Sequence, residues 1–163
     1  RRKLPDGSIA TDIIVGFPGE SEAQFQRTYD LLSELRLDVA HVARYSPRPQ
    51  TVAARRMVDD VPEEEKMRRF RLLEDLQTGI VDEINRGYLG REIEVLVEGK
   101  RSGRWMGRSR TNKLVFFESE DNLRAEEVRV SIEHTGPWSL RGSLSRSAET
   151  PLQPAFHLLP VLN

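Results

Sequence analysis

The hydrophobic period changes once along the chain, near residue 90. Before this point, short apolar runs alternate with segments of helical spacing, whereas beyond it apolar and polar residues alternate with period two. A helix and a strand need these different periods to bury one apolar face. The change therefore predicts an α/β unit over residues 1–89 and an all-β unit over residues 90–146. We expect residues 147–163, which contain three prolines, to form an irregular tail.

The first unit has the pattern strand, helix, strand. Residues 9–15 are rich in β-branched side chains and end at Gly16, which is typical of a strand buried on both faces. Ser21 and Gln24 form a capping box ahead of a helix whose apolar spacing reaches Leu35. A second strand candidate covers residues 39–45. This order predicts a parallel βαβ unit with a right-handed crossover.

A loop over residues 46–61 and a long helix from about Asp60 to Gly87 follow. The helix has acids in its first turn and one apolar stripe, formed by Met67, Phe70, Leu73, Leu76, Ile80 and Ile84. Two strands and two helices cannot close a parallel sheet by themselves. Because the chain also begins at Arg1 without a methionine, we expect a piece of a longer protein whose N-terminal part completes the sheet.

The second unit contains several short strand candidates in about 60 residues. They cover residues 92–98, 105–109, 114–118, 128–133 and 140–144, with a turn at 99–103. Short strands at this spacing predict a small five-stranded, OB-like closed barrel. By its place in the pattern, Trp138 is expected in the core of the barrel.

A basic segment in the second unit is the strongest indication of a nucleic-acid partner. Residues 100–113 contain no acid, and their candidate RNA contacts are Lys100, Arg101, Arg104, Trp105, Arg108, Arg110, Asn112 and Lys113. Cations neutralise phosphates, and an aromatic face stacks on an unpaired base. We therefore expect binding of single-stranded or looped RNA, with Arg141 extending the patch. The alternative is a solvated basic hairpin with Trp105 partly in the core.

The loop from Gly16 to Glu20 lies where a parallel strand ends, which is the edge at which α/β sheets bind ligands. Its glycines allow the backbone to approach a ligand closely. A tight strand-to-helix turn without a ligand explains the spacing equally well. Asp12 lies inside the apolar run, so we expect a buried structural carboxylate with its hydrogen bonds satisfied.

The composition excludes several kinds of chemistry. Without cysteine the chain has no disulfide, no thiol nucleophile and no cysteine ligand for an iron–sulfur cluster. The histidines, His41, His134 and His157, lack metal-ligand spacing, so we predict no catalytic residue and no metal site in this chain. No apolar run approaches the length of about 18 residues that crosses a bilayer, and no signal peptide opens the chain. We therefore expect a cytoplasmic protein with no membrane partner.

Six segments in order carry a resemblance to a known family. They are residues 11–20 (TDIIVGFPGE), 45–51 (YSPRPQT), 58–66 (VDDVPEEEK), 97–99 (VEG), 107–117 (GRSRTNKLVFF) and 139–142 (SLRG). Together they cover roughly residues 4–146, and the chain resembles the C-terminal part of radical-SAM tRNA methylthiotransferases of the MiaB branch, including their TRAM domain. Gln50 and Val52 depart from the family, which has glycine and proline there.

The resemblance implies the last βα units of a radical-SAM partial (βα) barrel followed by a TRAM β-barrel. It implies addition of a 2-methylthio group to isopentenyl-adenosine in the tRNA anticodon stem-loop, with S-adenosylmethionine and two 4Fe-4S clusters in the full-length enzyme. Ile14, Gly16, Tyr45 and Ser46 would line the edge of the S-adenosylmethionine pocket. We expect no cofactor on this chain alone and no activity from it. The alternatives are a non-catalytic RNA-binding module and a sister enzyme acting on threonylcarbamoyl-adenosine or on a ribosomal protein.

Overall fold

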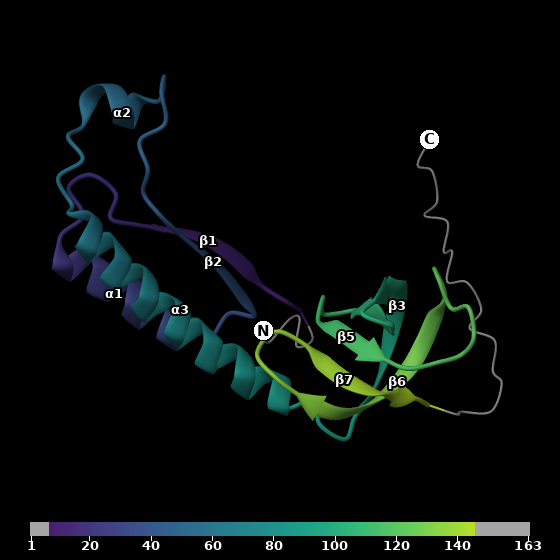
Figure 1. Cartoon of the computed structure of the whole chain (residues 1–163). Coiled ribbons are helices and arrows are strands. Elements are labelled where there is room, and N and C mark those ends of the chain that lie inside the picture. The colour runs from purple at the N-terminus through teal and green to yellow at the C-terminus, as the bar shows by residue number, and fades with distance from the viewer. Residues whose placement is uncertain (1–6, 146–163) are drawn as a thin grey trace, which may run out of the picture.

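The computed structural model describes residues 7–145 and contains both predicted architectures (Figure 1). The elements are β1 (Ala10–Val15), α1 (Glu22–Leu35), β2 (Val39–Arg44), α2 (Val52–Arg56), α3 (Glu63–Arg86), β3 (Glu92–Arg101), β4 (Arg104–Ser109), β5 (Leu114–Phe117), β6 (Glu127–Thr135) and β7 (Leu140–Leu144). The tail predicted at 147–163 lies outside the described residues. None of the helices in residues 7–145 is long and apolar enough to cross a membrane.

The predicted parallel βαβ unit is confirmed. β1 and β2 pair in parallel, with Ala10 opposite Val39 and Val15 opposite Arg44. Helices α1 and α3 pack side by side on one face of this two-stranded sheet (Figure 1), where Phe25, Leu32 and Leu73 form the core with the inward residues of both strands.

The prediction that the first strand is buried on both faces is wrong. Exposure alternates along β1, so Asp12 and Ile14 lie on the open face of the sheet, and Ile14 is 55% exposed. The reason is that the helices cover only one face of β1 and β2 within residues 7–145. Asp12 is therefore an exposed carboxylate in this structure and not a buried one.

The helix starts follow the local capping chemistry. The predicted capping box is confirmed, because the Ser21 side chain accepts from the Gln24 N–H and the Gln24 side chain accepts from the Ser21 N–H at 2.7 Å. The loop predicted at 46–61 contains the short helix α2, which sequence reasoning missed. Thr51 caps the N-terminus of α2, because its side chain accepts from the Ala54 N–H at 3.2 Å. This threonine is the feature of the sequence that could have predicted the helix.

Helix α3 connects the two units. Its 24 residues span about 36 Å at 1.5 Å per residue. The middle of the helix packs on the sheet through Leu73, and its last turn reaches the barrel. There Asn85 Nδ2 donates to the backbone oxygens of Gly136 at 2.7 Å and Pro137 at 3.2 Å. α3 is therefore in direct contact with both parts of the chain.

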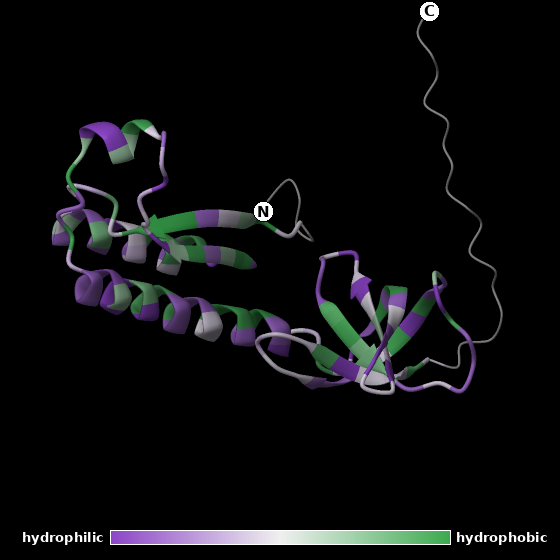
Figure 2. Cartoon of the chain, turned by 45° about the horizontal axis from the view of Figure 1, so that its top comes forward, coloured by the Kyte–Doolittle hydropathy of each residue, from purple (hydrophilic) through white to green (hydrophobic). Residues whose placement is uncertain are grey.

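The second unit is the closed five-stranded barrel that the sequence predicted. Its strand order is β3-β4-β5-β7-β6, with β5 and β7 parallel and the other neighbouring pairs antiparallel. Figure 2 shows hydrophobic and hydrophilic residues alternating along these strands. The inward set forms one core, made of Val95, Val97, Trp105, Val115, Phe117, Val130, Ile132 and Leu140.

Two details of the barrel differ from the sequence-based expectation. β3 continues to Arg101, so the turn is not 99–103 but the pair Ser102 and Gly103, whose φ angles of 52° and 82° suit a tight hairpin with the right-handed twist. Trp138 was expected in the core but is 66% exposed. It lies between β6 and β7, directly after Pro137, where the strand alternation has ended.

Candidate nucleic-acid interface

Three arginines and one aromatic ring meet on the outer surface of the barrel, at β4, β5, β7 and the end of β3. Arg101, Arg104, Phe116 and Arg141 line a hollow of about 410 Å³, which we call the arginine hollow. The pairing of parallel strands β5 and β7 places Phe116 opposite Arg141. Arg101 and Arg104 flank the two-residue turn between β3 and β4. The barrel closure therefore gathers cations from three separate strands around a half-buried phenylalanine.

Two of these arginines are available to an external anion. In the described part of the chain, Arg101 and Arg141 have no acidic group within 4 Å. Arg104 Nε lies 3.1 Å from Glu118 Oε1, but both side chains are about half exposed or more. An exposed pair of this kind contributes little and is readily exchanged for a phosphate. The hollow thus combines phosphate-binding cations with a ring face.

Two other cations of the basic segment, Arg108 and Arg110, are balanced by acids. Arg108 Nε lies 3.7 Å from Glu98 and donates from Nη1 to the Asn112 carbonyl at 3.2 Å. Asn112 itself has φ 60° and forms the turn between β4 and β5. Arg110 Nε lies 2.6 Å from Glu94 Oε2, which raises the pKa of its guanidinium.

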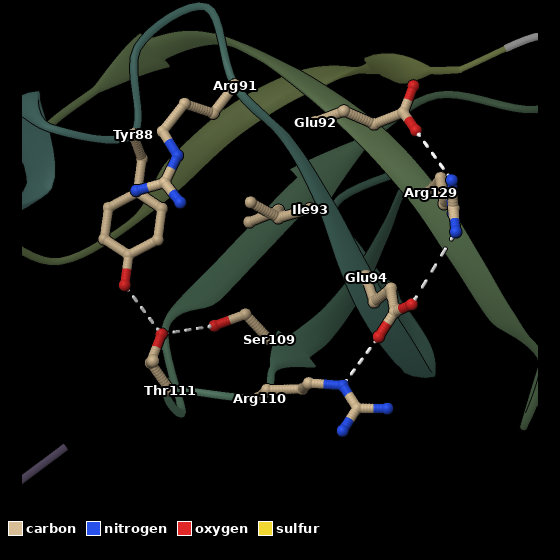
Figure 3. A pocket seen from close by; sticks show the side chains of 9 residues that line it. All are labelled: Tyr88, Arg91, Glu92, Ile93, Glu94, Ser109, Arg110, Thr111 and Arg129. Atoms are coloured by element: carbon tan, nitrogen blue, oxygen red, sulfur yellow. Dashed lines mark hydrogen bonds and ion pairs between the residues drawn. The ribbon is translucent and has the colours of Figure 1, made fainter. Parts of the chain in front are cut away.

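A second hollow, of about 390 Å³, lies on another side of the barrel (Figure 3). Arg129 bridges Glu92 and Glu94 there, at 3.4 and 3.9 Å, and Glu94 also pairs with Arg110. Two glutamates offset most of the charge of the three arginines that line it, whereas no acid lines the arginine hollow. This surface is therefore less suited to RNA than the arginine hollow.

Two residues predicted to contact RNA are buried, and we correct both predictions. Trp105 is only 5% exposed, lies in the barrel core and donates from Nε1 to the Ser119 carbonyl at 3.1 Å. Its outer face is covered by Lys100, whose Nζ lies 4.4 Å from the ring centroid. Lys113 is 8% exposed, and its Nζ lies 3.6 Å from Asp38 Oδ1 in the α/β unit. Neither side chain presents a contact surface to a ligand.

Sequence reasoning missed the aromatic residue that does face outward. Val115 and Phe117 are buried and Phe116 between them is half-buried, so the parity of β5 turns Phe116 toward the arginine hollow. This parity was readable from the sequence. The exposure of Trp138 was not, because it depends on a hairpin held by Asn85 from α3.

The four residues expected at a cofactor edge lie close together at the ends of β1 and β2. The Tyr45 N–H donates to the Val15 carbonyl at 2.8 Å, which holds the two strand ends side by side. Ile14 and Ser46 are exposed, whereas Gly16 and Tyr45 are buried. The ends of two parallel strands thus present an apolar side chain and a hydroxyl to any ligand at this edge.

The backbone angle and the packing at position 16 both require glycine. Its φ is +70°, and an added Cβ would overlap the Lys66 side chain that packs beneath it. The Gly16 N–H donates to Glu20 Oε2 at 2.6 Å and the Gly19 N–H donates to Asp60 Oδ1 at 2.7 Å. Because carboxylates already occupy these donors, the loop does not fit a phosphate. The exposed Ile14 side chain beside the loop offers apolar surface instead.

Comparison with known proteins first defines the class of the barrel: residues 86–145 match the family model of the TRAM domain. Over most of its length the chain is similar to enzymes named tRNA-2-methylthio-N(6)-dimethylallyladenosine synthase. The relative from Dehalococcoides mccartyi (strain CBDB1) is 50% identical over 147 residues, which are 90% of this chain and 35% of the relative. The relative from Roseiflexus sp. (strain RS-1) is 48% identical over 153 residues, 92% of this chain and 32% of the relative.

The relative from Pseudothermotoga lettingae is 42% identical over 147 residues, 90% of this chain and 34% of its own. The chain thus spans about a third of the length of the curated relatives it matches. These matches confirm the resemblance to the C-terminal part of tRNA methylthiotransferases with a TRAM domain.

Proposed function

We propose that this chain is part of a tRNA methylthiotransferase that adds a 2-methylthio group to isopentenyl-adenosine next to the anticodon. The observation that carries the proposal is identity near 50% over 90% of the chain, which includes both the βαβ unit and the barrel. An RNA-binding barrel alone would leave the similarity of the βαβ unit unexplained. With a tRNA substrate, we expect the reaction to take place in the cytoplasm.

In this proposal the barrel holds the anticodon stem-loop of the tRNA at the arginine hollow. Arg101, Arg104 and Arg141 neutralise phosphates, and Phe116 offers its ring to an unpaired base. Lys100 is exposed at the β3–β4 hairpin and adds positive charge near the hollow, whereas Arg108 and Arg110 are exposed but paired with acids. The arginines of the hollow are the ones whose loss should weaken binding most.

The α/β unit, residues 1–89, is proposed as the end of a radical-SAM partial barrel that an N-terminal part completes. S-adenosylmethionine would then lie at the ends of β1 and β2, against Ile14, Gly16, Tyr45 and Ser46. When bound, it supplies the radical chemistry of the reaction. The chain has no cysteine, so its residues do not fit the two 4Fe-4S clusters, whose ligands must come from elsewhere.

The RNA assignment is tested with two variants matched in charge, made in the full-length protein. Arg101→Gln with Arg141→Gln should make the plot of log affinity against log salt shallower by about 1.4 for a tRNA transcript, at about 0.7 per cation on single strands. Arg110→Gln with Arg129→Gln, which removes two acid-paired arginines from the same barrel, should change the slope much less. The opposite ranking would show that the arginine hollow is not the RNA site.

The second candidate is a non-catalytic RNA-binding module, and the absence of cysteine from this chain favours it. The coding sequence upstream of Arg1 separates the two candidates. A Cys-x3-Cys-x2-Cys run there, together with methylthiolated adenosine in tRNA treated with the full-length protein, supports the enzyme. An upstream region without cysteines removes the catalytic proposal and leaves the module.

A further inference from the structure

The loop between β1 and α1, residues 16–20, is held by side chains from a distant helix. Glu20 is the central residue of this contact, because its Oε2 accepts from the Gly16 N–H at 2.6 Å and from Arg69 Nη1 at 2.7 Å. Arg69 Nη1 also donates to the Glu20 carbonyl at 2.9 Å. One guanidinium therefore fixes both the side chain and the backbone of the residue that closes the loop.

Arg69 is itself held firmly. Its side chain is 5% exposed, and its Nε donates to Glu65 Oε1 at 2.6 Å on the preceding turn of α3. Burial disfavours the charged guanidinium, but the hydrogen bonds to Glu20 and Glu65 outweigh it and raise the pKa of Arg69. A buried, charge-assisted contact of this kind is stronger and more directional than a surface ion pair.

Lys66, one turn earlier on α3, supports the same strand ends from below. It is 1% exposed, and its stem fills the space where a Cβ on Gly16 would lie. Its Nζ donates to the carboxylates of Asp59 and Glu63 at 2.7 and 2.9 Å and lies 5.6 Å from the centroid of the Tyr45 ring. Gly16 and Tyr45, the buried residues of the candidate cofactor edge, are therefore both packed on one lysine.

We propose that Arg69 is a positioning residue, which holds Glu20 and thereby sets the loop 16–20 and the end of β1 in the shape that a nucleoside ligand at this edge requires. This inference rests on the proposed function, in which S-adenosylmethionine binds at the ends of β1 and β2. Arg69 does not touch the ligand. It acts through Glu20 and the Gly16 N–H, while Lys66 fills the space beneath Gly16.

The neighbouring Arg68 provides a matched control. It is also an arginine near the start of α3, it pairs with Glu22 and Glu65 at 2.7 Å each, and its guanidinium lies 5.7 Å from the Phe25 ring, as that of Arg69 lies 5.4 Å from it. In contrast to Arg69, its described contacts include none with the loop 16–20. The two variants therefore differ in the contact with Glu20 and in burial, since the Arg68 side chain is 46% exposed and that of Arg69 only 5%.

The experiment uses Arg69→Gln and Arg68→Gln in the full-length protein with S-adenosylhomocysteine as the probe. Arg69→Gln should weaken its binding by about tenfold or more, the loss expected when a charge-assisted hydrogen bond no longer orders a contact group. Arg68→Gln should stay within about twofold, as for an exposed ion pair. Hydrogen exchange in the peptide covering residues 15–20 should speed up only in Arg69→Gln, and tRNA affinity should be unchanged in both.

Arg69→Lys, which keeps a cation near Glu20, should recover part of the binding. If Arg69→Gln fails to fold, Glu20→Gln tests the same contact, because it keeps the acceptor for the Gly16 N–H and removes the charge facing Arg69. Equal loss in the Arg68 and Arg69 variants, or faster exchange with unchanged binding, overturns the inference and leaves the proposed function intact. An unmutated protein that binds no S-adenosylhomocysteine refutes the proposed cofactor role, and the inference with it.

Discussion

Lys113 belongs to the basic segment by sequence but has a structural role in the fold. Replacing it with methionine tests whether it stabilises the protein or binds RNA. Its Nζ lies 3.6 Å from Asp38 Oδ1, and the two side chains are only 9% and 6% exposed. At an effective dielectric constant of 20 the Coulomb attraction over this distance is about 4–5 kcal/mol, before the loss of hydration is subtracted. Removing one partner of a buried ion pair typically destabilises by about 3–5 kcal/mol.

We take about 3 kcal/mol for Lys113→Met, because the distance exceeds that of a direct hydrogen bond. For a chain of this size the Tm should fall by about 6–12 °C, measured by differential scanning calorimetry. Asp38→Asn combined with Lys113→Met should recover part of the loss, since the side chain that faced the lysine is then neutral. Arg101→Gln should do the reverse, lowering tRNA affinity while changing Tm little. If Lys113→Met leaves Tm unchanged but weakens tRNA binding, our assignment of this lysine to the contact between the two units is wrong.

Three further predictions concern the packing and the ion pairs. In urea unfolding, Gly107→Ala should destabilise the protein by about 2 kcal/mol or more, because an added Cβ would overlap the Leu96 carbonyl. Gly79→Ala on α3 should stabilise it by about 0.5–1 kcal/mol, because nothing lies within 4 Å of an added Cβ there. Hydrogen bonding to Arg68, against the effect of burial and with help from Arg69, lowers the pKa of Glu65 from 4.5 to about 2. Its stabilising effect should therefore be complete above about pH 4.5 and vanish near pH 2, so the difference in unfolding free energy between parent and Glu65→Gln should shrink over that range. Asn85→Ala should lower Tm and increase the mobility of Trp138, seen as reduced fluorescence anisotropy, because the carbonyls of Gly136 and Pro137 lose their donor; an unchanged anisotropy would contradict this role.

The elements with a sustained period were predictable, because repeated spacing decides which side of a helix or strand is apolar. That is why the start of β3, the body of β6 and the stripe of α3 through Leu73 and Ile80 were found. The short helix α2 has only five residues and one threonine cap, which is too little periodic signal. The apolar run of β1 led to a wrong prediction of its burial. Its composition suits a strand buried on both faces, whereas residues 7–145 cover only one face.

The candidate site was predicted at the level of the segment and missed at the level of the side chain. A count of charges placed the basic patch on the first barrel hairpin, but it could not tell which cations are balanced by acids from other strands. Arg110 faces Glu94 and Lys113 faces Asp38, and both contacts depend on tertiary pairing. Trp105 was predicted as the aromatic contact because it lies inside the basic segment, whereas the strand parity that turns Phe116 outward was not considered.

Helix α3 sets the distance and the orientation between the ends of β1 and β2 and the barrel. Its first turns hold Gly16 and Glu20, and its last turn holds the hairpin of Trp138, so its residue count fixes both a distance and an angle. Inserting one residue in its middle would advance the barrel by about 1.5 Å and rotate it by about 100° around the helix axis. A loop within one unit, such as residues 46–51 between β2 and α2, can change length without moving the barrel along or around this helix. The 24 residues of α3 cannot, and any lengthening that keeps the barrel facing the same way must add nearly whole turns.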